Sequence, residues 1–150
     1  MRDMIHTAAD GVLAAMDIGA GQGTRVALFE TPEQVVAERY FSRHEYGTSY
    51  EAFLERLRQD IEELLAESGH WELRAVGIAT PGVLRGDGSF KWVQNIPFLE
   101  GTNMREELER MYGVRTGIAN DADAGALAEW NVLRIDLLYW VFGGGWGGAW

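Results

Sequence analysis

The sequence predicts an α/β domain in which a mixed five-stranded sheet carries helices on both faces. Short apolar runs with the character of strands alternate with helical segments along the 150 residues. The first three strands are joined by short turns, as in an antiparallel meander, and helices separate the later strands, as in parallel β-α-β crossovers. Glycine, proline or polar residues follow several strands, and ligands of such sheets bind at these carboxyl ends.

The composition fits one globular domain and excludes several kinds of partner. Of the residues, 47% are hydrophobic and 24% are charged, which allows a sizeable core. The 13 basic and 23 acidic residues give a net charge of −10, so we expect no binding to nucleic acid or to an anionic membrane. The absence of cysteine excludes disulfides and thiolate metal sites. The N-terminal apolar run is short and contains Asp17, so we predict neither a signal peptide nor a membrane span, and expect a cytoplasmic protein.

Three predicted strands open the chain and enclose a glycine-rich turn. The strands cover residues 12–18, 24–30 and 35–42. Gly19, Gly21 and Gly23 lie between the first two strands with the spacing G-x-G-x-G. Dinucleotide-binding turns read G-x-G-x-x-G and open a helix, and a P-loop needs a following Gly-Lys-Ser or Gly-Lys-Thr, so both motifs are excluded. The residues alone leave open an ordinary hairpin turn or a turn that lets the backbone approach a phosphate.

The clearest predicted helix follows the third strand. Thr48-Ser49-Tyr50-Glu51 has the pattern of a capping box, in which a hydroxyl and a carboxylate satisfy free backbone amides. Apolar residues then recur at helical spacing as far as Leu65, with charged residues between them, and Gly69 is expected to end the helix. The helix should therefore bury one face and expose the other.

The rest of the chain alternates strands and helices. Strands are predicted over residues 73–79, 114–119 and 135–142, and helices over residues 102–111 and 120–130. Pro81-Gly82 ends the first of these strands, and an irregular segment follows, with a short hairpin expected around Asp87-Gly88. Thr102 or Asn103 is expected to cap the second helix.

Polar or glycine residues lie at three predicted strand ends. Asp17 precedes the glycine turn, Pro81-Gly82 follows the fourth strand, and Asn120-Asp121 follows the fifth and begins the alanine-rich helix. Because the carboxyl ends of strands gather ligands in such sheets, we expect the three groups to lie at one site. Taken alone, Asn120-Asp121 is explained as a helix cap, and Asn95 as an ordinary loop residue.

Five segments, taken in order, resemble the N-terminal lobe of the ROK family of bacterial sugar kinases and sugar-responsive repressors. They are DIGAGQGTRVALF, VGIATPG, QNIPFLEG, IANDADAGALAEW and FGGGWGG. The resemblance implies the actin-like, ribonuclease H-like ATPase fold, in which two lobes close over ATP and a sugar. It also implies that residues 1–134 form the N-terminal lobe and that residues 135–150 begin a second lobe whose remainder is missing here.

The resemblance implies ATP-dependent phosphorylation of a hexose hydroxyl, as in glucokinases and fructokinases, and a lobe that is inactive alone. Asp121 would be the catalytic base that accepts the proton of the sugar hydroxyl. The implied sugar-binding residues are Pro81, Gly82, Asn95, Asn120 and Asp121. The amides of the two asparagines offer both donors and acceptors to a ring of hydroxyls.

The implied cofactors are ATP and Mg²⁺. Asp17 would hold Mg²⁺ through water, and the residues that would serve the phosphates are Asp17, Gly19, Gly21, Thr24, Gly143, Gly144 and Gly145. The family's first turn usually reads Asp-x-Gly-Gly-Thr, whereas this turn is one residue longer and offers a threonine only at the shifted position of Thr24. The second glycine run has glycine where the family usually has threonine. The three histidines lack the spacing of a zinc site.

A regulator of the same family is the alternative interpretation. The altered glycine turn favours a sugar-sensing protein or degenerate sugar-binding domain that has lost phosphoryl transfer, whereas Asn120-Asp121 favours a kinase. A structural domain of the same fold, binding neither ligand, is a third interpretation. The aromatic and glycine-rich segment from Leu137 to Trp150 predicts a homo-oligomer contact.

Overall fold

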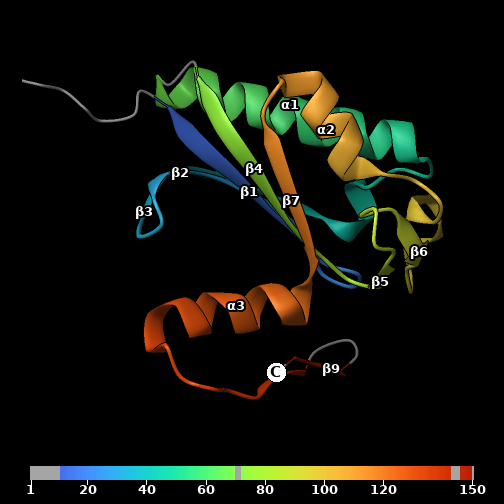
Figure 1. Cartoon of the computed structure of the whole chain (residues 1–150). Helices are drawn as coiled ribbons and strands as arrows, with labels where there is room; N and C mark the ends of the chain where they lie inside the picture. Colours follow the sequence, from blue (N-terminus) through green and yellow to red (C-terminus); the bar gives the residue numbers. More distant parts are fainter. Residues whose placement is uncertain (1–10, 70–71, 143–145, 150) are drawn as a thin grey trace, which may run out of the picture.

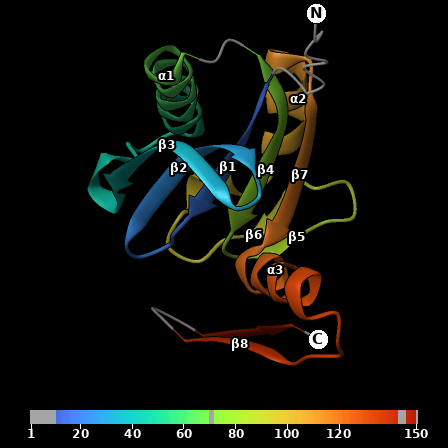
Figure 2. The ribbon, with the colours of Figure 1, turned by 90° about the vertical axis from the view of Figure 1, so that its left-hand side faces the viewer.

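The computed structural model describes residues 11–69, 72–142 and 146–149. Its centre is a five-stranded sheet in the order β3-β2-β1-β4-β7 (Figures 1 and 2). The strands are β1 (Val12–Ile18), β2 (Gly23–Thr31), β3 (Gln34–Ser42), β4 (Leu73–Thr80) and β7 (Arg115–Asn120). The first three pair antiparallel, while β4 is parallel to β1 and β7 is parallel to β4. The predicted mixed sheet, with a meander followed by crossovers, is confirmed.

Helices lie on both sides of this sheet. In Figure 1, α1 (Tyr50–Ser68) and α2 (Met104–Tyr112) cover one face, and α3 (Asp121–Leu133) lies on the other side, beyond the end of β7. The smaller elements are η1 (Arg43–Glu45), β5 (Val83–Leu84), β6 (Phe90–Trp92), η2 (Pro97–Leu99), β8 (Tyr139–Phe142) and β9 (Trp146–Ala149). The predicted hairpin around Asp87-Gly88 is formed by β5 and β6. In the described part of the chain, no helix is long and apolar enough to cross a membrane.

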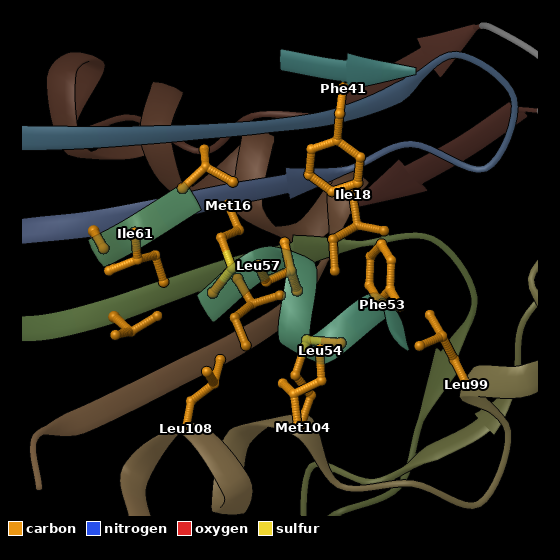
Figure 3. Close-up of a cluster of buried hydrophobic side chains, with 14 of the residues drawn as sticks. Met16, Ile18, Phe41, Phe53, Leu54, Leu57, Ile61, Leu99, Met104 and Leu108 are labelled. Atoms are coloured by element: carbon orange, nitrogen blue, oxygen red, sulfur yellow. The ribbon is translucent and has the colours of Figure 1, made fainter. Parts of the chain in front are cut away.

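The hydrophobic core lies between the sheet and α1 and α2. Figure 3 shows Met16 and Ile18 of β1 reaching toward Phe53 and Leu57 of α1. Alternate residues of β1 point to this side, as strand geometry requires, so Asp17 points to the opposite face. Complete burial of a large apolar side chain contributes about 1.5–3 kcal/mol, so this packing dominates the stability of the domain.

The start of α1 differs from the expected capping box. Ser49 is the N-cap, with an extended backbone, and its Oγ accepts a hydrogen bond from the amide of Ala52 at 3.2 Å. The predicted box of Thr48 and Glu51 is therefore wrong by one position. Gly69 ends the helix as predicted, in the left-handed conformation with φ of 75°.

The last predicted strand is also shorter than expected. Residues 135–138 lie outside any strand, and β8 begins at Tyr139. β8 pairs antiparallel with β9, which the sequence did not predict, and the two form a separate sheet beside α3. Apolar composition alone cannot separate a strand from an exposed apolar connection, and Ile135 and Leu138 are exposed.

The position of the cap can be tested by stability. Ser49→Ala should lower the free energy of unfolding by about 1 kcal/mol, because the Ala52 amide loses its acceptor. Thr48→Ala is the matched control and should change it by less than about 0.5 kcal/mol, because Thr48 is an exposed residue outside the helix. Chemical denaturation measures both variants. A larger loss in Thr48→Ala than in Ser49→Ala would contradict this cap.

Candidate active site

The three groups predicted at strand ends lie at one edge of the sheet. In the parallel register Asp17 of β1 pairs with Ala79 of β4, and Ala79 pairs with Ala119 of β7. One residue further along, Thr80 pairs with Asn120. The glycine turn after β1, Pro81-Gly82 after β4 and Asp121 after β7 therefore leave the sheet at the same level.

Asp17 and Asp121 are close enough to sense each other's charge. Partial burial raises the pKa of Asp17 above its ordinary value, the negative charge of Asp121 raises it further, and Arg25 partly opposes both. Asp17 and Arg25 also line a groove of about 600 Å³ between the open face of the sheet and α3. The groove is otherwise lined mainly by small and apolar side chains such as Ala15, Ala27 and Leu127.

Asp121 is the first residue of α3 and is held there by the backbone. Its Oδ1 accepts a hydrogen bond from the amide of Ala122 at 2.9 Å, and this amide hydrogen is shared with Oδ1 of Asn120. Among the described residues its other carboxylate oxygen has no hydrogen-bond partner. The helix dipole favours a negative charge at this end. Asp121 therefore presents an oxygen that can accept a proton from a ligand.

Asn120 joins α3 to the turn after β4. Its Oδ1 accepts from the Ala122 amide at 2.9 Å, and its Nδ2 donates to the carbonyl of Gly82 at 2.9 Å. Asn120 and Gly82 line a polar hollow of about 580 Å³, together with Arg85, Arg105 and other residues. Asn120 thus caps α3, as its position before the helix predicts, and it also lines the polar hollow.

The glycine of Pro81-Gly82 is required by the backbone conformation and by a close contact. Gly82 has φ of 94°, and a Cβ built there would lie 2.4 Å from the carbonyl oxygen of Trp92. Only glycine fits this contact between the β4–β5 turn and β6. Pro81 is half-buried beside it.

Asn95 lies in the loop between β6 and η2. It is exposed and has φ of 67°, a left-handed conformation that asparagine tolerates better than most residues. Its carbonyl oxygen accepts a hydrogen bond from Nη2 of Arg43 at 2.5 Å. Among the described residues no hydrogen bond joins Asn95 to Asn120 or Asp121.

The glycine turn is a closed hairpin loop with free amides at its tip. The Gly19 amide donates to the Gly23 carbonyl at 2.8 Å, so this predicted phosphate donor already has a partner. The amides of Ala20, Gly21 and Gln22 have no acceptor anywhere in the described residues. Successive free amides at a turn form a concave site for an anion. The sequence did not identify Ala20 and Gln22 as possible phosphate donors, because every residue except proline has a backbone amide and the residue type does not show which amides are free.

Thr24 does not reach this site. It is completely buried on the core side of the sheet, opposite to Asp17, and its Oγ1 donates to the hydroxyl of Tyr46 at 2.8 Å. We therefore leave Thr24 out of the proposed site. The predicted phosphate residues Gly143, Gly144 and Gly145 lie outside the described residues.

The site fits a magnesium ion held mainly by water and phosphate. Among the described residues, no three histidine, aspartate or glutamate side chains gather closely enough to hold a metal by themselves. Asp17 is a single carboxylate that feels the charge of a second, Asp121, and a nearby cation would relieve this repulsion. Mg²⁺ commonly binds proteins through one or two carboxylates while its other ligands are water and substrate phosphates.

The fold and this convergence of strand ends define a domain of the actin-like ATPase fold. The sequence model of the ROK family matches residues 13–149, so the chain belongs to the ROK family. The N-acetylgalactosamine kinase AgaK of Shewanella sp. (strain ANA-3) is 32% identical over 114 residues, which are 76% of this chain and 35% of that protein.

Solved structures of ROK proteins share the fold. The ROK family glucokinase of Streptomyces griseus, in complex with glucose and AMPPNP, has a TM-score of 0.75 at 19% identity, over 92% of this chain and 43% of that one. The ROK hexokinase of Thermus thermophilus has a TM-score of 0.72 at 25% identity, over 91% of this chain and 45% of that one. The chain therefore spans 35% to 45% of the length of these three proteins.

Removing the charge of Asp17 should stabilise the domain at neutral pH. The folded pKa of Asp17 lies above 3.8, so its ionisation costs stability as the pH rises from the unfolded to the folded pKa. Asp17→Asn should therefore have a higher melting temperature than the wild type at pH ~7, and the difference should shrink toward pH ~4. Thermal denaturation across this range measures it. An equal or lower melting temperature of the variant at neutral pH would contradict the prediction.

A double-mutant cycle tests whether the two carboxylates share one space. Each of Asp17→Asn and Asp121→Asn removes the same repulsion, so the double variant should gain less stability than the two single variants together. Asp123→Asn is the control, because Asp123 is exposed and does not affect the pKa of Asp17. Its combination with Asp17→Asn should be additive. Additivity in the Asp17 and Asp121 cycle would show that the carboxylates are independent.

Proposed function

We propose that this chain provides the catalytic base and the first phosphate-binding loop of a sugar kinase. The reaction transfers the γ-phosphoryl group of ATP to a hydroxyl of a hexose. The observation that carries the proposal is that the hairpin loop with free amides and Asp121, at the start of α3, leave the sheet at the same edge. Membership of the ROK family and the similarity to an N-acetylgalactosamine kinase support it.

Asp121 is the base of the proposed reaction. Its oxygen without a partner accepts the proton of the sugar hydroxyl while that oxygen forms a bond to the γ-phosphorus. The bond between the γ-phosphorus and the bridging oxygen breaks, and ADP leaves. The bond from Oδ1 to the Ala122 amide fixes the carboxylate during this transfer. A base of this kind accelerates the reaction by about 100- to 10,000-fold.

The sugar is proposed to lie against the polar hollow beside Asn120. Asn120 keeps one free Nδ2 proton and one free lone pair after its bonds to Gly82 and Ala122, and these can meet sugar hydroxyls. The exposed amide of Asn95 and the backbone at Pro81-Gly82 complete the proposed contacts on this chain.

The phosphates are proposed to lie against the glycine loop. The amides of Ala20, Gly21 and Gln22, which have no acceptor among the described residues, would donate to phosphate oxygens, and Asp17 would hold Mg²⁺ through water. When bound, the metal ion neutralises the negative charge of the phosphates. Gly143, Gly144 and Gly145 are proposed to form the second phosphate turn.

The domain boundary is proposed to follow α3. Residues 1–134 then form the N-terminal lobe and residues 135–150 begin the second, and the 150-residue chain alone is inactive. The exposed apolar side chains of Val132, Ile135 and Leu138 suit contact with another lobe or another copy of the chain.

The catalytic assignment is tested by ADP release from the complete protein with a panel of hexoses. Asp121→Asn keeps the shape of the side chain and should lower kcat by about 100- to 10,000-fold, because the base is lost. Glu129→Gln is the matched control on the same helix, because Glu129 is exposed and lines neither the groove nor the polar hollow, and it should retain a kcat within about two-fold of the wild type. Turnover of Asp121→Asn near the wild-type rate would remove Asp121 from the mechanism.

A sugar-sensing regulator without phosphoryl transfer remains the second candidate. Two expected phosphate donors favour it, because each already has an acceptor within the domain. The Gly19 amide donates to Gly23, and the buried Thr24 hydroxyl donates to Tyr46. Calorimetry of the complete protein with glucose and with a non-hydrolysable ATP analogue separates the two candidates. Binding of the sugar without binding of the nucleotide would identify the sensor and refute the kinase.

A further inference from the structure

Hydrogen bonds hold the glycine loop, residues 19–23, against the end of β3 and the η1 turn that follows β3. The hydroxyl of Tyr46 donates to the carbonyl of Gly19 at 2.7 Å. The carbonyl of Gln22 accepts two hydrogen bonds, from the Arg43 amide at 3.0 Å and from the Tyr40 hydroxyl at 2.9 Å. Both ends of the loop are thus held through their carbonyl groups, and the amides between them stay free.

The side chain of Tyr46 has one defined position. It is 1% exposed, and its ring packs against Phe41 and Phe53 with centroids 5.5 and 4.8 Å away. Its hydroxyl accepts from Thr24 while it donates to Gly19, so both functions of the hydroxyl are used. A ring buried in the core therefore sets the position of the first residue of the loop.

Arg43 connects this loop to the loop of Asn95. Its guanidinium lies 4.7 Å from the centroid of the Tyr46 ring and donates to the Asn95 carbonyl at 2.5 Å. Its own amide donates to Gln22 on the other side. A single residue thus contacts the loop proposed for the phosphates and the loop proposed for the sugar.

We infer that Tyr46 and Arg43, here called the clasp, are positioning residues that hold the glycine loop and Asn95 in a fixed relation. This inference rests on the proposed kinase function. Tyr46 positions the loop amides for the nucleotide, and the Arg43 side chain positions Asn95 for the sugar. Small displacements matter, because phosphoryl transfer depends mainly on alignment of the donor and the acceptor.

The two halves of the clasp predict different kinetic effects. Tyr46→Phe removes the hydroxyl, and with it the bonds to Gly19 and Thr24, and should raise the KM for ATP about three- to ten-fold, with the sugar KM unchanged. Arg43→Gln keeps the backbone bond to Gln22 and should raise the sugar KM by a similar factor, with the ATP KM unchanged. Tyr112→Phe is the control, because the Tyr112 hydroxyl contacts Arg58 at 3.5 Å and not the loop.

Hydrogen exchange gives a readout that does not depend on activity. In Tyr46→Phe, peptides over residues 17–25 should exchange faster while peptides of α1 keep the wild-type rate. Kinetics and exchange are measured on the complete protein. An unchanged ATP KM together with unchanged exchange of the loop would overturn the clasp, and so would an equal rise of both KM values with faster exchange throughout.

The failure of the clasp and that of the proposed function are distinguishable. If the wild type releases no ADP with any hexose, the kinase proposal fails and the exchange of the loop alone decides the clasp. If the wild type is active and Tyr46→Phe behaves like Tyr112→Phe in both measurements, the kinase stands and the clasp is wrong.

Discussion

The burial of Met16 and Ile18 beneath α1 is the interaction on which the site depends. A shift of one residue in the pairing of β1 would turn these two side chains to the open face and Asp17 into the core. Such a shift would lose several kcal/mol of apolar burial and bury a carboxylate, so the register is strongly determined. The position of Asp17 on the open face of the sheet is thus set by its neighbours Met16 and Ile18, which are buried in the core.

The two faces of the sheet differ in the size and packing of their side chains. The side toward α1 and α2 is filled with large apolar side chains, whereas Ala15, Gly77 and Ala119 on the other side leave room for a groove next to α3. On this open side partial burial and then the charge of Asp121 raise the pKa of Asp17, so the charged form of this carboxylate costs stability. Active sites commonly accept such a cost, because groups arranged for a ligand are not arranged for stability.

Much of this arrangement could be predicted from the sequence because strands and caps leave local patterns. The bounds of β1, the hairpin after it and the convergence of three strand ends were all accessible in this way. The alternation of β2 also places Thr24 on the same buried side as Val26. The prediction that Thr24 serves the phosphates came from the resemblance to the family's turn and disregarded this alternation. The bond from Tyr46 to Gly19 spans 27 residues and depends on tertiary packing, so no local pattern could reveal it.

The hydrogen bonds that hold the glycine loop bear on the anion site proposed there, although this loop is one residue longer than the family's usual turn. Three glycines in five residues make a flexible chain, and ordering such a chain around a phosphate costs conformational entropy. In this structure the Gly19–Gly23 bond closes the base of the loop, and Tyr46, Arg43 and Tyr40 hold its carbonyl groups. Much of the entropy is therefore lost when the domain folds, before any ligand arrives. Three adjacent amides remain free beside Asp17, and these are the donors of the proposed phosphate site.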